Sequence, residues 1–353
     1  MTLRSDPFYR AVLQQAWAEG RDIQYGITYG LLRPDRATQE LLGAVVHLPW
    51  RNWNPEEVRG GETGMWLVRR TTDETAIRDR VGQGWHGAEW ALQHLLGTPP
   101  RETPTWLRVM AHWHLYSTSH AASSRFQTAD DLRRLVAEHS VECQMSRGEQ
   151  WLLHHPEHSL GWHPFHEGSG AMRRAPWWGL VSLVPNQAAA RSYTDATWAY
   201  RGRAPGLCAA IASTVSHLAL QPPQSSIEIM QALMTAIHRA TPRHATVRSL
   251  VATLWRRMRY GVAIEDQCQW IAHQAYFFPY DHVLPNVLVQ LLALGYGASK
   301  WDSTLDLLST AGWDIATNAI IVGTLLGLQG LQPVRRMEAL DSEIAATLRQ
   351  ISG

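Results

Sequence analysis

Oxygen-bearing side chains that could bind a hard cation stand within residues 311–319, which read AGWDIATNA. Asp314 occupies a position typical of a helix N-cap, and Thr317 follows three residues later on the same helix face. A carboxylate and a hydroxyl are oxygen ligands of the kind that Mg²⁺ prefers. The same pattern also fits a capped helix that only packs, because small residues then recur at every fourth position. These are Ala319, Gly323 and Gly327.

A second group of oxygen ligands, Thr72-Asp73-Glu74-Thr75, stands at the start of a long predicted helix over residues 75–96. Acidic residues in a first helical turn are also a common cap, so the residues alone leave a metal site and a cap both open. Residues 161–176 are rich in Gly, His and Pro and predict a long irregular loop. Such loops often line a site.

The chain has 17 histidines, most of which lack the spacing of a metal site. The groups at residues 112–114 and 154–158 therefore predict structural or surface roles. His163 and His166 are the exception, since both fall in the predicted loop. Either could act as an acid or a base near neutral pH.

Helical periodicity dominates the chain and predicts an all-α fold with a single domain over residues 1–353. Only residues 43–48 and 65–69 suggest strands. The predicted helices cover residues 8–19, 75–96, 105–116, 128–138, 188–200, 204–220, 225–240, 243–261, 285–294, 303–311, 314–328 and 338–351.

Composition excludes several classes of function. The net charge is +1, so there is no basic footprint for nucleic acid. The longest apolar run, residues 319–331, is too short and too rich in glycine to span a membrane, and residues 1–10 lack the apolar core of a signal peptide. A cytoplasmic protein is therefore expected. The 17 tryptophans predict mainly core packing, with an aromatic pocket wall as the alternative for a few.

Four segments, in order, resemble motifs of the ADP-ribosylglycohydrolases. Residues 168–176, GSGAMRRAP, are similar to the family's Asn-Gly-Ala-Ala-Met-Arg-x-x-Pro, and residues 312–317, GWDIAT, to its Gly-Gly-Asp-Thr-Asp-Thr. Residues 214–217 and 282–286 supply the two segments between them. Thr72-Asp73-Glu74-Thr75 looks like the family's Thr-Asp-Asp-Thr. Residues 160–330 give the best match, and residues 1–130 diverge.

The resemblance implies an ADP-ribosylglycohydrolase-like orthogonal helical bundle and assigns roles to its residues. The implied metal ligands are Thr72, Asp73, Glu74, Asp314 and Thr317. The implied catalytic residues are Asp73, Glu74, His163 and His166. The implied substrate-binding residues are Gly168, Ser169, Arg173 and Trp313. Ala316 stands where the family has a carboxylate, so one Mg²⁺ ion or none is expected rather than two.

The resulting hypothesis is a hydrolase that cleaves a ribosyl or ADP-ribosyl glycosidic bond, on an ADP-ribosylated substrate or a nucleotide-derived small molecule. Two alternatives stay open. One is a metal-independent enzyme that acts on an aromatic or nucleotide-derived metabolite through histidine. The other is a binding or structural homologue without catalysis, because a fold alone does not settle function.

Overall fold

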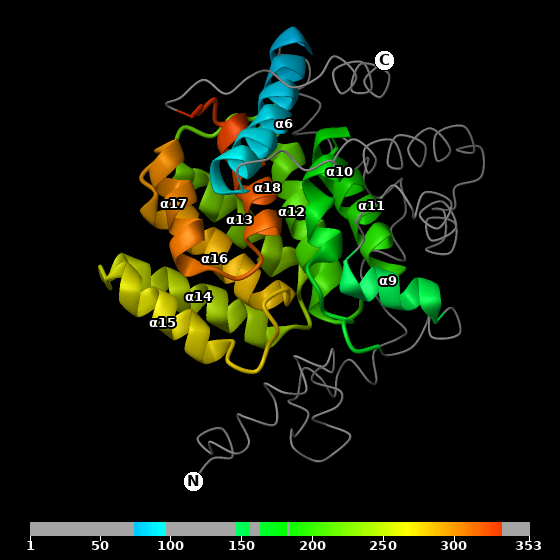
Figure 1. The fold of residues 1–353 in the computed structure, drawn as a ribbon. Helices are drawn as coiled ribbons and strands as arrows, with labels where there is room; N and C mark the ends of the chain where they lie inside the picture. The colour runs from blue at the N-terminus through cyan, green and yellow to red at the C-terminus, as the bar shows by residue number, and fades with distance from the viewer. Residues whose placement is uncertain (1–73, 97–145, 156–162, 182–183, 334–353) are drawn as a thin grey trace, which may run out of the picture.

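The computed structural model of the chain describes residues 74–96, 146–155, 163–181 and 184–333. This part is 75% helical and contains no β-strand, which confirms the predicted all-α class (Figure 1). The helices are α6 (Glu74–Leu96), α9 (Arg147–His154), η3 (Gly170–Arg173, a 3₁₀ helix), α10 (Ala175–Val181), α11 (Pro185–Thr197), α12 (Arg203–Leu220), α13 (Ser226–Ala240), α14 (Ala245–Arg259), α15 (Ile264–Gln274), α16 (Val283–Tyr296), α17 (Trp301–Ala311) and α18 (Ile315–Leu328).

Four of the described helices, α9, α13, α16 and α18, begin at a residue whose side chain caps them. Ser225 accepts a hydrogen bond from the N–H of Glu228 at the start of α13, and Ser146 and Glu149 form a capping box at the start of α9. Asp314 caps α18 by accepting from the N–H of Thr317, which confirms the predicted N-cap. No described helix is long and apolar enough to cross a membrane.

Three helices, α12, α16 and α18, carry most of the core. Nearly every residue of each is buried, so these helices are apolar on all sides rather than on one stripe. Figure 1 shows α18 enclosed by α6, α12 and α16. The start of α18 is therefore fixed in position by packing along the rest of its length.

The contact between α6 and α18 is the most extensive one between any two described helices. Glycines make it possible. A Cβ added to Gly87 of α6 would strike the carbonyl oxygen of Gly323, and one added to Gly323 would strike the carbonyl oxygen of Gly87. Gly327 likewise meets the backbone of Gln83. The small-residue stripe predicted from the sequence is confirmed as a helix-packing surface.

Most predicted helices in the described part are present within a few residues of their predicted ends. One prediction was wrong: residues 161–176 are not irregular throughout, because η3 and the start of α10 fall among them. The helices α9 and α15 had no counterpart in the prediction. The predicted helices at residues 8–19, 105–116, 128–138 and 338–351, and the predicted strands at 43–48 and 65–69, lie outside the described residues.

We expect Gly323→Ala to lower the free energy of unfolding by about 1–3 kcal/mol or more, because the new methyl group would have to push the backbone of α6 away. Gly82→Ala is the matched control. Gly82 also lies in α6, but its added Cβ would have no neighbour within 4 Å, so this helix-favouring change should raise stability by up to about 1 kcal/mol. Urea unfolding of both variants measures the difference. Equal stability of Gly323→Ala and the wild type would contradict the close packing.

Candidate functional site

The carboxylate of Asp314 is the centre of a compact polar cluster. Its Oδ2 accepts hydrogen bonds from the hydroxyls of Ser169 and Thr317, each at 2.6 Å, and its Oδ1 accepts from the N–H of Thr317 at 3.2 Å. Arg173 donates from Nε to the hydroxyl of Thr317 at 3.4 Å, which is a long hydrogen bond. The structure thus brings together four residues that the sequence had assigned to metal or substrate binding.

Backbone hydrogen bonds fix the segments that carry this cluster. The N–H of Ser169 donates to the carbonyl of Asp281 at 2.6 Å, and Gly168 forms an isolated antiparallel bridge with His282. The side chain of Asn286, at the start of α16, accepts from the N–H of Asp314 at 2.9 Å and donates to the carbonyl of His282 at 2.8 Å. Three segments distant in sequence therefore meet at Asp314.

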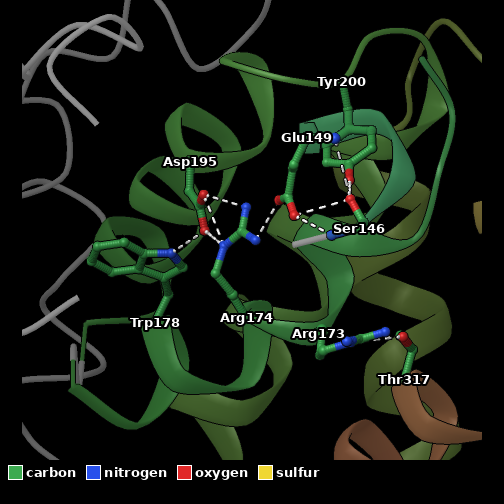
Figure 2. A network of polar contacts seen from close by, with 8 residues as sticks. All are labelled: Ser146, Glu149, Arg173, Arg174, Trp178, Asp195, Tyr200 and Thr317. Atoms are coloured by element: carbon green, nitrogen blue, oxygen red, sulfur yellow. Dashed lines mark hydrogen bonds and ion pairs between the residues drawn. The ribbon is translucent and has the colours of Figure 1, made fainter. Parts of the chain in front are cut away.

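Two consecutive arginines divide their roles between this cluster and the interior. Figure 2 shows that Arg173 and Arg174 leave the end of η3 in different directions. Arg173 extends to Thr317 of α18, whereas Arg174 extends to Glu149 and Asp195. The buried anchoring of Arg174 consequently fixes the backbone from which Arg173 projects.

The Arg174 network is buried and densely hydrogen-bonded (Figure 2). Its guanidinium donates to both carboxylate oxygens of Asp195 and to Glu149, and Trp178 donates its indole N–H to Asp195 at 2.8 Å. Burial opposes the charge of Arg174, but Asp195 and Glu149 raise its pKa well above the ordinary value. Burial, followed by the charge of Glu149, also raises the pKa of Tyr200, which hydrogen-bonds Ser146.

A second buried ion pair joins the loop before Ser169 to α12 and α16. Glu167 accepts from the guanidinium of Arg203 at 2.7 Å and from the Nε2 of His282 at 3.0 Å. Burial by itself would raise the pKa of Glu167, but Arg203 and His282 hold it well below its usual range. His282 accepts from the N–H of Leu284 through Nδ1, so its ring is neutral. Burial is the main cause of its lowered pKa.

His166 lies beside this ion pair, His163 lies near Trp151 and Tyr200, and both histidines are buried. The Nε2 of His163 hydrogen-bonds the carbonyl of Ala199, and its Nδ1 accepts from the N–H of Phe165 at 3.2 Å. The Nδ1 of His166 hydrogen-bonds the carbonyl of His163 at 2.9 Å. Both ring nitrogens of His163 thus hold the backbone, an arrangement that favours a structural role over proton transfer for this residue.

The aromatic residues near the cluster differ in their setting. Trp177 and Trp178 are buried in the core. Of the two interpretations that the sequence left open for the tryptophans, core packing applies to this pair. Trp313 is half-buried and directly precedes Asp314. Its φ of 68° is in the left-handed region, which is strained for a bulky residue and is often found near functional sites. Trp313 is the one aromatic side chain that adjoins Asp314 in sequence and remains partly exposed.

The family assignment follows from a comparison over most of the chain. The sequence model of the ADP-ribosylglycohydrolase family matches residues 35–338. The chain belongs to this family. Comparisons with curated proteins and with solved structures found no match. ADP-ribosylglycohydrolases act on ADP-ribosylated substrates and generally depend on Mg²⁺, and membership of this family supports an ADP-ribosylglycohydrolase-like hydrolase.

The described residues do not supply the donor set of a paired-magnesium centre. Asp314 is the single carboxylate of the cluster, and both of its oxygens already accept hydrogen bonds. Ala316, which faces the core, has no oxygen to add. Within the described ranges, no three His, Cys, Asp or Glu side chains form a group that could hold a metal ion. Two ions need bridging carboxylates, and Asp314 is the one carboxylate that the described residues bring to this cluster.

The other predicted ligands fall at or before the start of α6. Thr72 and Asp73 lie outside the described residues, and Glu74 is described only as the first residue of α6. Sequence reasoning also passed over the supporting residues Glu149, Asp195 and Glu167. Of these three, Asp195 had a signal in the sequence, because it is the one acidic residue of an alanine-rich predicted helix.

Asp195→Ala should lower the free energy of unfolding by about 3–5 kcal/mol, because it leaves the buried charge of Arg174 with one carboxylate and removes the partner of Trp178. Asp266→Ala is the control, since Asp266 is an exposed residue in the first turn of α15 and should contribute less than about 1 kcal/mol. Urea denaturation followed by circular dichroism tests both. A loss of similar size in the two variants would contradict the described network.

The neutral, buried ring of His282 predicts a stability that falls in mild acid. As the pH drops below about 6.5, the unfolded chain binds a proton at this ring while the folded chain does not, so up to about 1.4 kcal/mol is lost per pH unit. Glu167 acts in the same direction only at lower pH, below about 4.5.

The test compares the free energies of unfolding at pH 7 and pH 5. His282→Gln removes the titrating ring and should show a shallower loss over this range than the wild type, whereas the exposed His154→Gln should keep the wild-type slope. The same slope in all three proteins would show that His282 titrates normally.

Proposed function

We propose that the chain hydrolyses the glycosidic bond of an ADP-ribosyl or ribosyl group, with the Asp314 cluster as the place that binds the ribose. The observation that carries the proposal is the convergence of Ser169, Arg173, Asp314 and Thr317, contributed by two distant segments, in a chain of the ADP-ribosylglycohydrolase family. This convergence supports a common site rather than two unrelated structural features.

The chemistry of the cluster suits a ribose. A carboxylate that already accepts from two hydroxyls can exchange them for the two vicinal hydroxyls of the sugar, since the donors are of the same type. Its negative charge would also favour the positive, oxocarbenium-like ring that develops as the glycosidic bond breaks. Arg173 would offer its guanidinium to a phosphate of the same ligand.

Activation of the attacking water is assigned to Asp73 or Glu74, which the proposal places near Asp314 by resemblance. We assign at most one Mg²⁺ ion to the site. Its ligands would be Asp314 and Thr317, together with Thr72, Asp73 and Glu74. The neutral hydroxyls around Asp314 and the alanine at position 316 support this low metal requirement.

A second candidate function is binding of ADP-ribose without turnover. It is favoured by the shortage of metal-binding oxygens, because Asp314 is the single carboxylate of the cluster and Ala316 adds no side-chain oxygen. The cluster is also closed, since Ser169 and Thr317 are buried and Asp314 is only 6% exposed. The carboxylate is thus satisfied within the protein, as it would be in a structural anchor. A ligand must break these hydrogen bonds to reach Asp314, whether the site is catalytic or only binds.

The test measures release of ADP-ribose from mono-ADP-ribosylated protein and binding of free ADP-ribose, each with Mg²⁺ and with a chelator. For Asp314→Asn we expect a loss of at least about tenfold in release, since a charged acceptor contributes at least about 1.4 kcal/mol. Asp306→Asn is the control, because Asp306 is exposed and lies in α17, outside the Asp314 cluster.

The outcomes separate the candidates. Release that depends on Asp314 supports hydrolysis, and binding that depends on Asp314 without release supports the second candidate. Full release or full binding by Asp314→Asn would contradict the assignment of either function to this cluster.

A further inference from the structure

Positive charge is concentrated in one part of the chain, away from the residues assigned above. Residues 229–264 contain six arginines and no aspartate or glutamate, although the chain as a whole has a net charge of only +1. This stretch includes most of α13 and all of α14, which adjoins α15 at one edge of the molecule (Figure 1). The surface formed by α13 and α14 is therefore strongly cationic.

A groove of about 320 Å³ lies between α13 and α14 within this surface. Its apolar part comes from Met234, Ile237 and Val251, and its polar part from His238, Arg239 and Arg248. A volume near 300 Å³ is at the small end of the range for pockets that hold small molecules. The groove thus combines an apolar wall with a cationic side in a space that suits one small ligand.

The two arginines of the groove have no counter-charge in the described structure. Neither Arg239 nor Arg248 forms an ion pair or a hydrogen bond with a described residue, and the Nε of Arg248 is buried without a partner. The positive potential reaches neighbouring groups, since Arg239 adds to the effect of burial in lowering the pKa of His217. By contrast, Arg257 at the far end of α14 bonds Gln267 and stacks on Trp270.

We propose that this groove binds a small organic anion, namely a carboxylate or phosphate monoester joined to an apolar group. The two arginines that line the groove provide the planar guanidinium donors that carboxylate and phosphate accept best. The apolar wall formed by Met234, Ile237 and Val251 would bury the body of the ligand. The site is independent of Asp314 and of the function proposed for it.

The experiment titrates the full chain with phenyl phosphate and with benzoate, which share a ring and differ in the anion, and follows binding by calorimetry and by NMR. Phenol tests the apolar contribution alone, and inorganic phosphate tests the charge alone. We expect both aromatic anions to bind more tightly than phenol or inorganic phosphate by at least about tenfold.

Arg239→Gln and Arg248→Gln should each weaken binding of the aromatic anions by at least about tenfold, because each removes one charged donor pair. Arg243→Gln is the matched control: Arg243 lies in the same basic stretch and is exposed, but it does not line the groove. Asp314→Asn should bind the anions as the wild type does, which separates this proposal from the glycosidase function. Arg239 is exposed, so its variant tests the site even if Arg248→Gln fails to fold.

Four results would overturn the proposal. They are the absence of binding by both aromatic anions at millimolar concentration, equal binding of phenol, equal weakening by Arg243→Gln, and binding of an acidic peptide or an oligonucleotide without binding of the small anions. The last result would indicate a macromolecular interface in place of a small-molecule site.

Discussion

Hydrogen bonds to one buried carboxylate, that of Asp314, hold the central part of this molecule together. The side chain of Asp314 accepts hydrogen bonds from two hydroxyls and one backbone N–H, and its own N–H donates to the side chain of Asn286. These bonds join the segment that carries Ser169, the start of α16 and the start of α18. Because all of these groups are buried, each needs its partner, and a change in one segment forces a response in the other two. The candidate site and the junction of the fold are the same set of atoms.

Around this junction, buried charge is arranged in two separate groups. Arg174 is held between Glu149 and Asp195, and Glu167 is held between Arg203 and His282. Both groups flank the segment with Ser169 and Arg173, so the loop that meets α18 is fixed on either side by ion pairs in a low-dielectric interior. These ion pairs support the backbone from which Ser169 and Arg173 project, so the loop is held in one position.

Sequence periodicity was sufficient for the helices but not for the environment of their polar residues. The apolar pattern of α12, α16 and α18 and the cap at Asp314 were predictable because they rest on local rules. The family motifs also predicted that Ser169 and Thr317 belong together. The pairing of Glu149 with Arg174, and of Glu167 with His282, depends on which segments meet in three dimensions, and no local pattern encodes that. The roles of Thr72, Asp73 and Glu74 remain predictions.

The glycine contact between α6 and α18 also bears on how the protein is made. The two helices stand more than 200 positions apart in the sequence, so α6 leaves the ribosome long before its partner exists. At synthesis rates of about 5–20 residues per second, the delay is on the order of ten seconds or more. During that time the face with Gly87 lacks the helix that covers it in the fold, and its contact with α18 is of the long-range kind that slows folding. Assembly around Asp314 is accordingly a late event, completed when the last described helix arrives.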